Sequence, residues 1–156
     1  MGEGFNFNLT NLKVDQLGYV FKDIEKQAKI MEDLFGLDKL IFGKESTNVF
    51  NYRGSNSTIK TRMAFGRISN TQIELIQWIE GDCIYKEFLE QGKEGLHHIA
   101  VYVDDIQACI NHFKQRGIEL LQSGEILRHN FAYMDTLDTF GIYLEFLEMV
   151  KRKKKK

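Results

Sequence analysis

The 156-residue sequence contains no proline and only two cysteines, Cys83 and Cys109. Without proline, its turns must rely on Gly, Asn, Asp and Ser. We expect both cysteines to be free, because the segments around them belong to different predicted helices and a chain of this length can bury a core without disulfides. No apolar run approaches the roughly 18 residues that a membrane span requires, so we expect no membrane partner.

The N-terminal residues also lack the basic and apolar regions of a secretory signal peptide, which favours a cytoplasmic protein. The net charge is −1, but it is unevenly distributed. Residues 151–156 read KRKKKK and hold six of the 21 basic groups, which leaves 15 basic against 22 acidic residues, or −7, in residues 1–150. An acidic body does not favour nucleic acid as a partner. The basic run is typical of a solvated tail, although a role in seeking phosphate or a membrane surface stays open.

Two stretches of the chain, residues 15–24 and 97–106, repeat each other at a separation of 82 residues. The repeat places Gln16 on His98, Gly18 on Ala100 and Asp23 on Asp105. Each copy begins with alternating apolar residues, as a strand does, and continues into a helix that the aspartate can cap. An internal repeat of this kind predicts that the fold is built twice.

Each half continues with strand-like segments, so each half is predicted to be β-α-β-β-β and the fold class α+β. In the second half the predicted strands are 118–122, 125–128, 130–135 and 142–148. The predicted layout is a leader over 1–12, a first βαβββ module over 13–80, a connector with a short helix over 81–95, a second βαβββ module over 96–149, and a basic tail over 150–156.

The last strand of each half carries a glutamate among apolar residues, Glu74 in the first and Glu145 in the second. A carboxylate in such a position is costly to bury without a partner. Together with Gln16 and His98 from the first strands, these residues supply one amide oxygen, two carboxylates and one imidazole. That set suits a divalent Zn, Ni, Co, Mn or Fe ion and leaves open positions, whereas structural zinc sites favour thiolates.

The sequence resembles the vicinal oxygen chelate superfamily, which includes glyoxalase I, methylmalonyl-CoA epimerase, extradiol dioxygenases and antibiotic-resistance proteins. The resemblance covers about residues 13–148. The motifs that carry it are Gln72-Ile73-Glu74-Leu75-Ile76, Phe88-Leu89, Gly95-Leu96-His97-His98-Ile99-Ala100 and Val103-Asp104-Asp105-Ile106. It implies paired modules that form a cupped, barrel-like mixed sheet with helices outside, around one divalent metal ion held by Gln16, Glu74, His98 and Glu145.

Within the superfamily, the motifs are most similar to the epimerases and their glyoxalase-like relatives, which usually have His where this chain has Gln16. Eukaryotic-type zinc glyoxalase I is similar to this chain at that position. The resemblance implies a metal-dependent isomerase or lyase that removes a proton beside a metal-bound carbonyl and passes through an enediolate. Glu145 would be the base, and Glu74 the second catalytic carboxylate on the opposite face. Gln16 cannot take up a proton and would only bind or orient.

The resemblance further implies a small substrate with adjacent oxygens, either an acyl-CoA or a thiol adduct, and a homodimer in which modules pair within or across chains. Two other functions stay open: a non-enzymatic protein that binds an antibiotic or similar small molecule, and an extradiol-type dioxygenase. Several further side chains could belong either to a pocket or to ordinary packing and solvated surface: Phe65, Trp78, Phe131, Tyr133, His129, Arg62, Arg67 and Arg128.

Overall fold

The computed structural model describes residues 4–152 and 155. In chain order the elements are η1 (Leu9–Asn11), β1 (Gln16–Val20), α1 (Ile24–Phe35), β2 (Ile41–Phe42), β3 (Ser46–Tyr52), β4 (Ser55–Ile68), β5 (Thr71–Glu80), α2 (Ile84–Glu90), β6 (Gly95–Tyr102), α3 (Ile106–Lys114), β7 (Leu120–Ile126), β8 (His129–Met134), α4 (Leu137–Phe140) and β9 (Tyr143–Met149). Residues 1–3 of the expected leader and residues 153, 154 and 156 of the expected tail lie outside the described residues.

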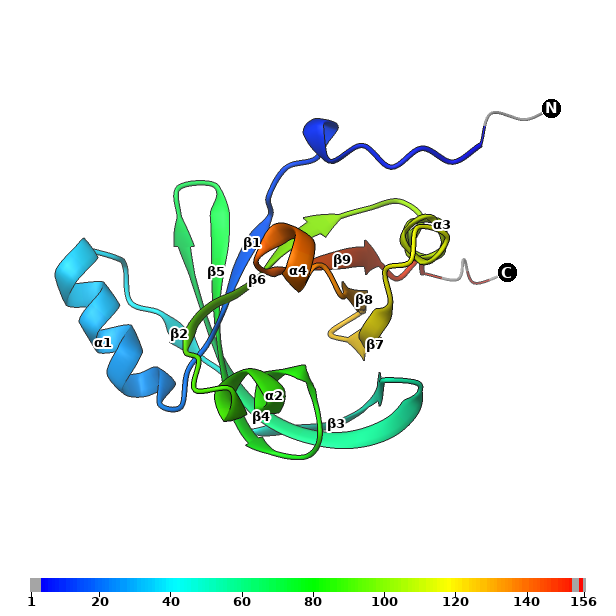
Figure 1. The fold of residues 1–156 in the computed structure, drawn as a ribbon. Coiled ribbons are helices and arrows are strands. Elements are labelled where there is room, and N and C mark those ends of the chain that lie inside the picture. The colour runs from blue at the N-terminus through cyan, green and yellow to red at the C-terminus, as the bar shows by residue number, and fades with distance from the viewer. Residues whose placement is uncertain (1–3, 153–154, 156) are drawn as a thin grey trace.

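The strands form one mixed sheet in the order β2-β4-β3-β7-β8-β9-β6-β1-β5, and β4 also pairs with β5. Eight strands therefore close into a barrel-like ring, with β2 added at an edge of β4. The ring is joined most narrowly between β3 and β7, where two residue pairs meet. Figure 1 shows the strands curving around a common interior, with α1 and α3 on the outside. The predicted α+β, cupped architecture is confirmed, and a single chain supplies both halves of the ring.

The repeat in the sequence is visible in the topology. In each half the first strand is followed by a helix and pairs in parallel with the last strand, β1 with β5 and β6 with β9. The two first strands, β1 and β6, pair with each other in antiparallel fashion. The predicted caps also form, because the side chains of Asp23 and Asp105 accept hydrogen bonds from the backbone N–H groups of Lys26 and Ala108.

Alternation along each strand divides the apolar side chains between the two surfaces of the ring. Outward-facing residues pack beneath α1 in one core cluster and beneath α3 in another. Inward-facing residues form a third cluster together with α2. On β1, β5, β6 and β9, the inward positions include the four polar residues of the predicted site, each of them less than 9% exposed.

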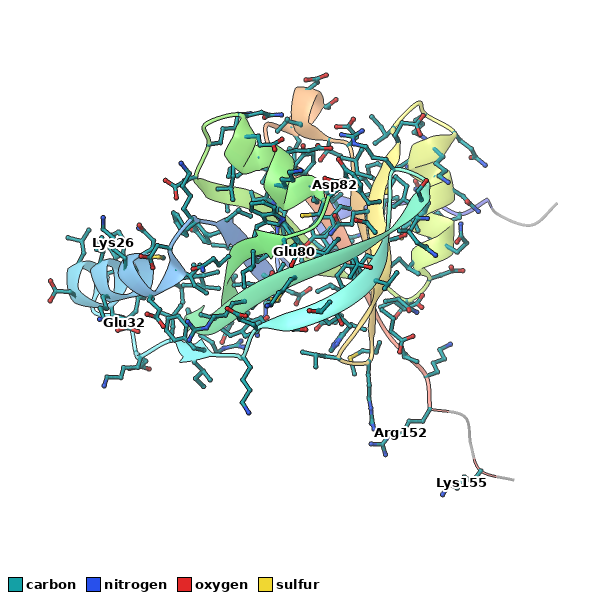
Figure 2. The ribbon with its side chains drawn as sticks, turned by 90° about the horizontal axis from the view of Figure 1, so that it is seen from below. Lys26, Glu32, Glu80, Asp82, Arg152 and Lys155 are labelled. Atoms are coloured by element: carbon teal, nitrogen blue, oxygen red, sulfur yellow. The ribbon has the colours of Figure 1, made fainter. Side chains whose placement is uncertain are left out.

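The second half of the chain differs in two places from the predicted elements. The predicted strands 118–122 and 125–128 are one strand, β7, because the Ser123-Gly124 pair continues the ladder with β8 instead of turning. The four-residue helix α4 was not predicted. Leu34 and Phe35, at the C-terminal end of α1, are 68% and 66% exposed, since α1 extends beyond the sheet it covers (Figure 2). Both cysteines are free, as expected, and both are buried. Among the described residues, no helix combines the length and apolar character needed to cross a membrane.

Candidate metal centre

The four predicted site residues lie around two small residues at the centre of the ring. Gly18 on β1 is paired with Glu74 on one side and His98 on the other. Ala100 on β6 is paired with Gln16 on one side and Glu145 on the other. Each small residue thus has a glutamate on one neighbouring strand and a second polar residue on the other. All four polar side chains point into the ring.

Three of these side chains converge closely. One ligand atom from each of Glu74, His98 and Glu145 lies within 4.8 Å of the other two, and all three residues are buried. The His98 Nε2 atom is 3.4 Å from Glu74 Oε2 and 3.2 Å from Glu145 Oε2. Residues that are distant in the sequence are thus brought into one cluster because β6 lies between β1 and β9, and β1 lies beside β5.

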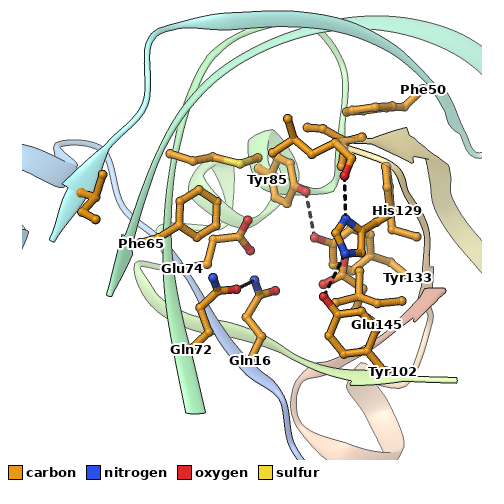
Figure 3. A pocket seen from close by; sticks show the side chains of 16 residues that line it. Gln16, Phe50, Phe65, Gln72, Glu74, Tyr85, Tyr102, His129, Tyr133 and Glu145 are labelled. Atoms are coloured by element: carbon orange, nitrogen blue, oxygen red, sulfur yellow. Dashed lines mark hydrogen bonds between the residues drawn. The ribbon is translucent and has the colours of Figure 1, made fainter. Parts of the chain in front are cut away.

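Gln16 lines the same cavity but is turned toward a neighbour on β5. Its Nε2 donates a hydrogen bond of 2.8 Å to Gln72 Oε1, as Figure 3 shows. The bond uses the amide nitrogen, which leaves the carbonyl oxygen of Gln16, the atom able to bind a cation, outside this interaction. Gln72 was not predicted as a site residue. It lies two residues before Glu74 on the same strand, so its position on the same face of the strand was an available signal.

The chemistry of the cluster fits a divalent cation. His98 Nε2 and Glu145 Oε2 are buried and have no hydrogen-bond partner among the described residues, although they lie 3.2 Å apart. Buried polar atoms are normally satisfied, and those left unpartnered point to a missing ion or water. Two carboxylates and one imidazole that face a common point form a suitable ligand set for such an ion.

A second histidine supports the first. His98 Nδ1 lies 2.9 Å from His97 Nδ1. Burial, and then the neighbouring His98, hold the pKa of His97 well below its usual value and keep His97 neutral, so its Nδ1 can accept a hydrogen bond from His98 Nδ1–H. This bond turns the Nε2 atom of His98 toward the two carboxylates. Metal-binding histidines are commonly oriented by a partner on their other nitrogen.

The cluster is electrostatically coupled. Burial disfavours a charged His98, but the adjacent Glu145 and Glu74 carboxylates outweigh burial and raise the pKa of His98 to about 9. Burial raises the pKa of Glu145, and the positive charge on His98 opposes that rise. In the absence of a cation, the imidazolium thus offsets part of the negative charge of the two carboxylates.

This coupling predicts a pH-dependent stability of the metal-free protein. Because the pKa of His98 is higher in the folded chain than its ordinary 6.5, its contribution is complete below about pH 6.5 and is lost as the pH rises through about 9. The loss amounts to on the order of 3 kcal/mol of unfolding free energy. Urea unfolding in the presence of a chelator should show it, and the His98→Gln variant should lack it. Added Zn²⁺ should reverse the trend, because metal binding requires a neutral imidazole. Equal pH dependence in both proteins would refute the coupling.

The contact between the two histidines gives a further prediction. His97→Leu removes the acceptor for His98 Nδ1–H and should weaken metal binding by roughly 10–100-fold. His97→Gln keeps a side-chain oxygen and should restore part of the affinity. Competition with a chromophoric chelator measures both. If His97→Leu binds the metal as tightly as the unaltered protein, His97 has only a packing role, among Phe88, Tyr85 and Tyr143.

Glu74 and Glu145 of the cluster form part of the wall of a cavity of about 450 Å³. Its lining residues are Gln16, Ile41, Phe50, Met63, Phe65, Gln72, Glu74, Tyr85, Tyr102, Ile126, Leu127, His129, Phe131, Tyr133, Glu145 and Leu147. Of the side chains that the sequence left between pocket and packing, Phe65, Phe131, Tyr133 and His129 line it, whereas Trp78 and the three arginines do not. Tyr85 was missed at the sequence level; its hydroxyl lies 2.9 Å from that of Tyr133.

A family profile described as the glyoxalase/bleomycin resistance protein/dioxygenase superfamily matches residues 15–133. The chain belongs to this superfamily. The match runs from β1, which contains Gln16, into β8. It therefore includes strands from both halves of the ring. The resemblance stated from the motifs is confirmed at the level of the superfamily, whose members include many enzymes. No curated protein matches the chain.

Several solved structures share the fold of the chain. A hypothetical protein from Bacillus halodurans, BH1468, is 21% identical with a TM-score of 0.62, over 94% of this chain and 99% of its own. Methylmalonyl-CoA epimerase from Mycobacterium tuberculosis is 20% identical with a TM-score of 0.62, and the match covers 91% of this chain and 89% of the epimerase. A methylmalonyl-CoA epimerase in complex with methylmalonyl-CoA and NH4+ is 16% identical with a TM-score of 0.61, and the match covers 88% of this chain and 94% of that epimerase. At these identities the likeness establishes the architecture alone.

Proposed function

We propose that the protein is a metal-dependent isomerase or lyase that removes a proton from a carbon beside a carbonyl group. The observation that carries the proposal is the buried convergence of His98 with two carboxylates, Glu74 and Glu145, at the wall of a cavity. The residues proposed to hold one divalent cation (Zn, Ni, Co or Mn) are Gln16, Glu74, His98 and Glu145. When bound, the cation would polarise the carbonyl of a substrate with adjacent oxygens and stabilise the negative charge that develops there.

Glu145 is the proposed base. It lies inside the ring on β9, and burial raises its pKa, which brings a carboxylate closer to the range useful for proton transfer near neutral pH. Tyr133 is its neighbour on β8, and its pKa is raised well above the usual value by burial, so its phenol remains protonated and able to donate a hydrogen bond. Glu145 can thus take up a proton in a site where Tyr133 is an adjacent donor.

Glu74 gives the site a second carboxylate, from the other half of the ring. Two bases that face a substrate from different sides suit an epimerase, which must remove a proton from one face and return it to the other. A glyoxalase I-type lyase, which moves a proton between neighbouring carbons, could work with Glu145 alone. Both candidate activities, methylmalonyl-CoA epimerase-like and lactoylglutathione lyase-like, are consistent with the pair. The expected substrate is an acyl-CoA or thiol adduct, and a cytoplasmic homodimer is part of the proposal.

Substrate-dependent deuterium exchange tests the function. The metal-loaded protein is incubated in D₂O with methylmalonyl-CoA and, separately, with the adduct of methylglyoxal and glutathione. Incorporation of deuterium that stops when the ion is chelated supports proton abstraction at this site. A protein that retains a divalent ion yet exchanges neither substrate would contradict the assignment for both. Tight binding of a small molecule unchanged by a chelator would favour a sequestering protein instead.

A further inference from the structure

The cavity beside the carboxylates is mostly apolar beyond the polar cluster. Phe50, Phe131 and Tyr133 form one wall by edge-to-face contacts, with ring centroids 4.8 Å and 5.8 Å apart. Met63 and Phe65 on β4 contribute to the lining as well, and Figure 3 shows Phe65 and Tyr133 on opposite sides of the cavity. An apolar wall of this kind stabilises an apolar ligand by removing its surface from water.

No lysine or arginine among the described residues lines the cavity. Arg62 instead pairs with Glu25 at 2.6 Å, and Arg67 donates to the backbone oxygen of Asn70. The charged side chains that line the cavity are those of Glu74 and Glu145, and both are acidic. An additional anionic group in the cavity would lose its hydration without gaining a cationic partner, and this is costly in a buried environment.

The rim of the cavity is apolar at two conspicuous places. Ile41 on β2 is 75% exposed, and Leu127 in the turn between β7 and β8 is 78% exposed. Leu127 and Arg128 have φ values of 49° and 63°, a left-handed conformation that leucine rarely adopts. His129 holds this turn, because its Nδ1 donates to the Leu127 oxygen (2.9 Å) and its Nε2 accepts from the Tyr102 hydroxyl (3.1 Å). An exposed leucine kept in an unfavourable backbone conformation at a cavity mouth is difficult to explain by stability alone.

The size of the cavity fits a ring or a branched chain. Its volume of about 450 Å³ is several times the ~150 Å³ of a cavity that holds benzene. A second hollow of about 410 Å³ shares Met63, Phe65, Ile126 and Leu127 with it and continues toward Lys44 and Glu125, one charge of each sign. The remote part of a larger substrate could leave the cavity along this path.

We propose that the substrate group adjoining the chelating oxygens is uncharged and apolar, of the size of an aryl or branched alkyl group, and is held by Phe65, Phe131 and the rim residues Ile41 and Leu127. This inference rests on the proposed function. It assigns chemistry to the reacting end of the substrate and leaves the carrier, coenzyme A or another thiol, unrestricted.

Three hydroxamates test the inference on the zinc-loaded protein, because all chelate through the same pair of oxygens and differ only in the attached group. Isothermal titration compares acetohydroxamate, benzohydroxamate and succinic monohydroxamate, which carry a methyl, a phenyl and a carboxylate-bearing group. Benzohydroxamate should bind at least tenfold more tightly than acetohydroxamate, and succinic monohydroxamate more weakly than either. Equal affinities, or a preference for the carboxylate, would overturn the inference while leaving the metal site intact. If none of the three binds, the metal site itself fails, and the inference fails with it.

Substitutions at the rim make the test specific to this cavity. Ile41→Lys and Leu127→Lys add a cation at exposed positions and should reduce the preference for benzohydroxamate over succinic monohydroxamate by at least fivefold. Val49→Lys is the matched control, since Val49 is 61% exposed on β3 and lines neither hollow. If the rim variants and the control leave the preference equally unchanged, the apolar group is not bound at this rim and the proposal is overturned.

Discussion

Replacing Glu145 by Gln is expected to lower substrate-dependent deuterium exchange by about 10²–10⁴-fold, the range that a positioned general base contributes. The glutamine is nearly isosteric and keeps one oxygen that can bind a cation, but it cannot accept a proton. Exchange should therefore fall much further than metal occupancy. The measurement is the rate of deuterium incorporation at saturating metal, with metal content determined on the same sample.

Two comparisons sharpen this result. Glu80→Gln makes the same chemical change at an exposed position at the end of β5 and should leave exchange unaltered. Glu74→Gln distinguishes the two candidate reactions: a two-base epimerase loses exchange with one substrate enantiomer in Glu74→Gln and with the other in Glu145→Gln. A one-base lyase depends on Glu145 alone. Wild-type exchange in Glu145→Gln at full metal occupancy would show that another group is the base.

The second large effect is expected from Gly18→Ala, which should lower metal affinity by at least about 10²-fold. A Cβ atom on Gly18 would lie 1.9 Å from Cε1 and 2.0 Å from Nε2 of His98, so the imidazole must leave its position between Glu74 and Glu145. A misplacement of about 1 Å is sufficient for losses of this order in a preorganised site. Because Gly18 has no left-handed φ, the strand itself can accept an alanine.

Competition for Zn²⁺ with a chromophoric chelator measures the affinity of the Gly18 variant. Gly43→Ala serves as the control, because a Cβ there meets its nearest neighbour at an ordinary 3.5 Å. Overcrowding a buried position commonly costs 1–3 kcal/mol of stability, so unfolding curves of both variants should accompany the titration. Unchanged zinc affinity in a folded Gly18→Ala protein would mean that the imidazole of His98 is not a ligand.

The close approach of His98 to Gly18 illustrates which features of the site could be predicted from the sequence and which could not. The 82-residue repeat was sufficient to predict the two halves, their capped helices and the corresponding places of Gln16 and His98. It aligned Gly18 with Ala100 but gave no reason for their difference. That reason is the path of His98 across Gly18, which depends on the pairing of β1 with β6 and is visible only in three dimensions.

Residues contributed by the connector and by turns were also beyond the sequence pattern. Tyr85 reaches the interior because α2 packs against the inward-facing cluster, and no periodicity signals that contact. Leu127 falls in a two-residue turn that contains neither Gly nor Asn, the residues that usually mark such turns, so the predicted strand 125–128 ran through it. His97 and His98 are consecutive on β6, so alternation along the strand places their side chains on opposite faces. The contact between their Nδ1 atoms depends on the orientation of the two rings, which alternation does not predict.

The most direct test of the account is the number of divalent ions that the protein binds. The purified chain is stripped with a chelator, dialysed to equilibrium against Zn²⁺ or Co²⁺ and analysed for metal, beside His98→Gln and the double variant Glu74→Gln/Glu145→Gln, with folding checked by circular dichroism. The account predicts one ion per chain for the unaltered protein and a large loss of affinity in both variants. An unaltered protein that retains no ion, or folded variants that bind as tightly as it does, would contradict the assignment of this cluster as a metal centre.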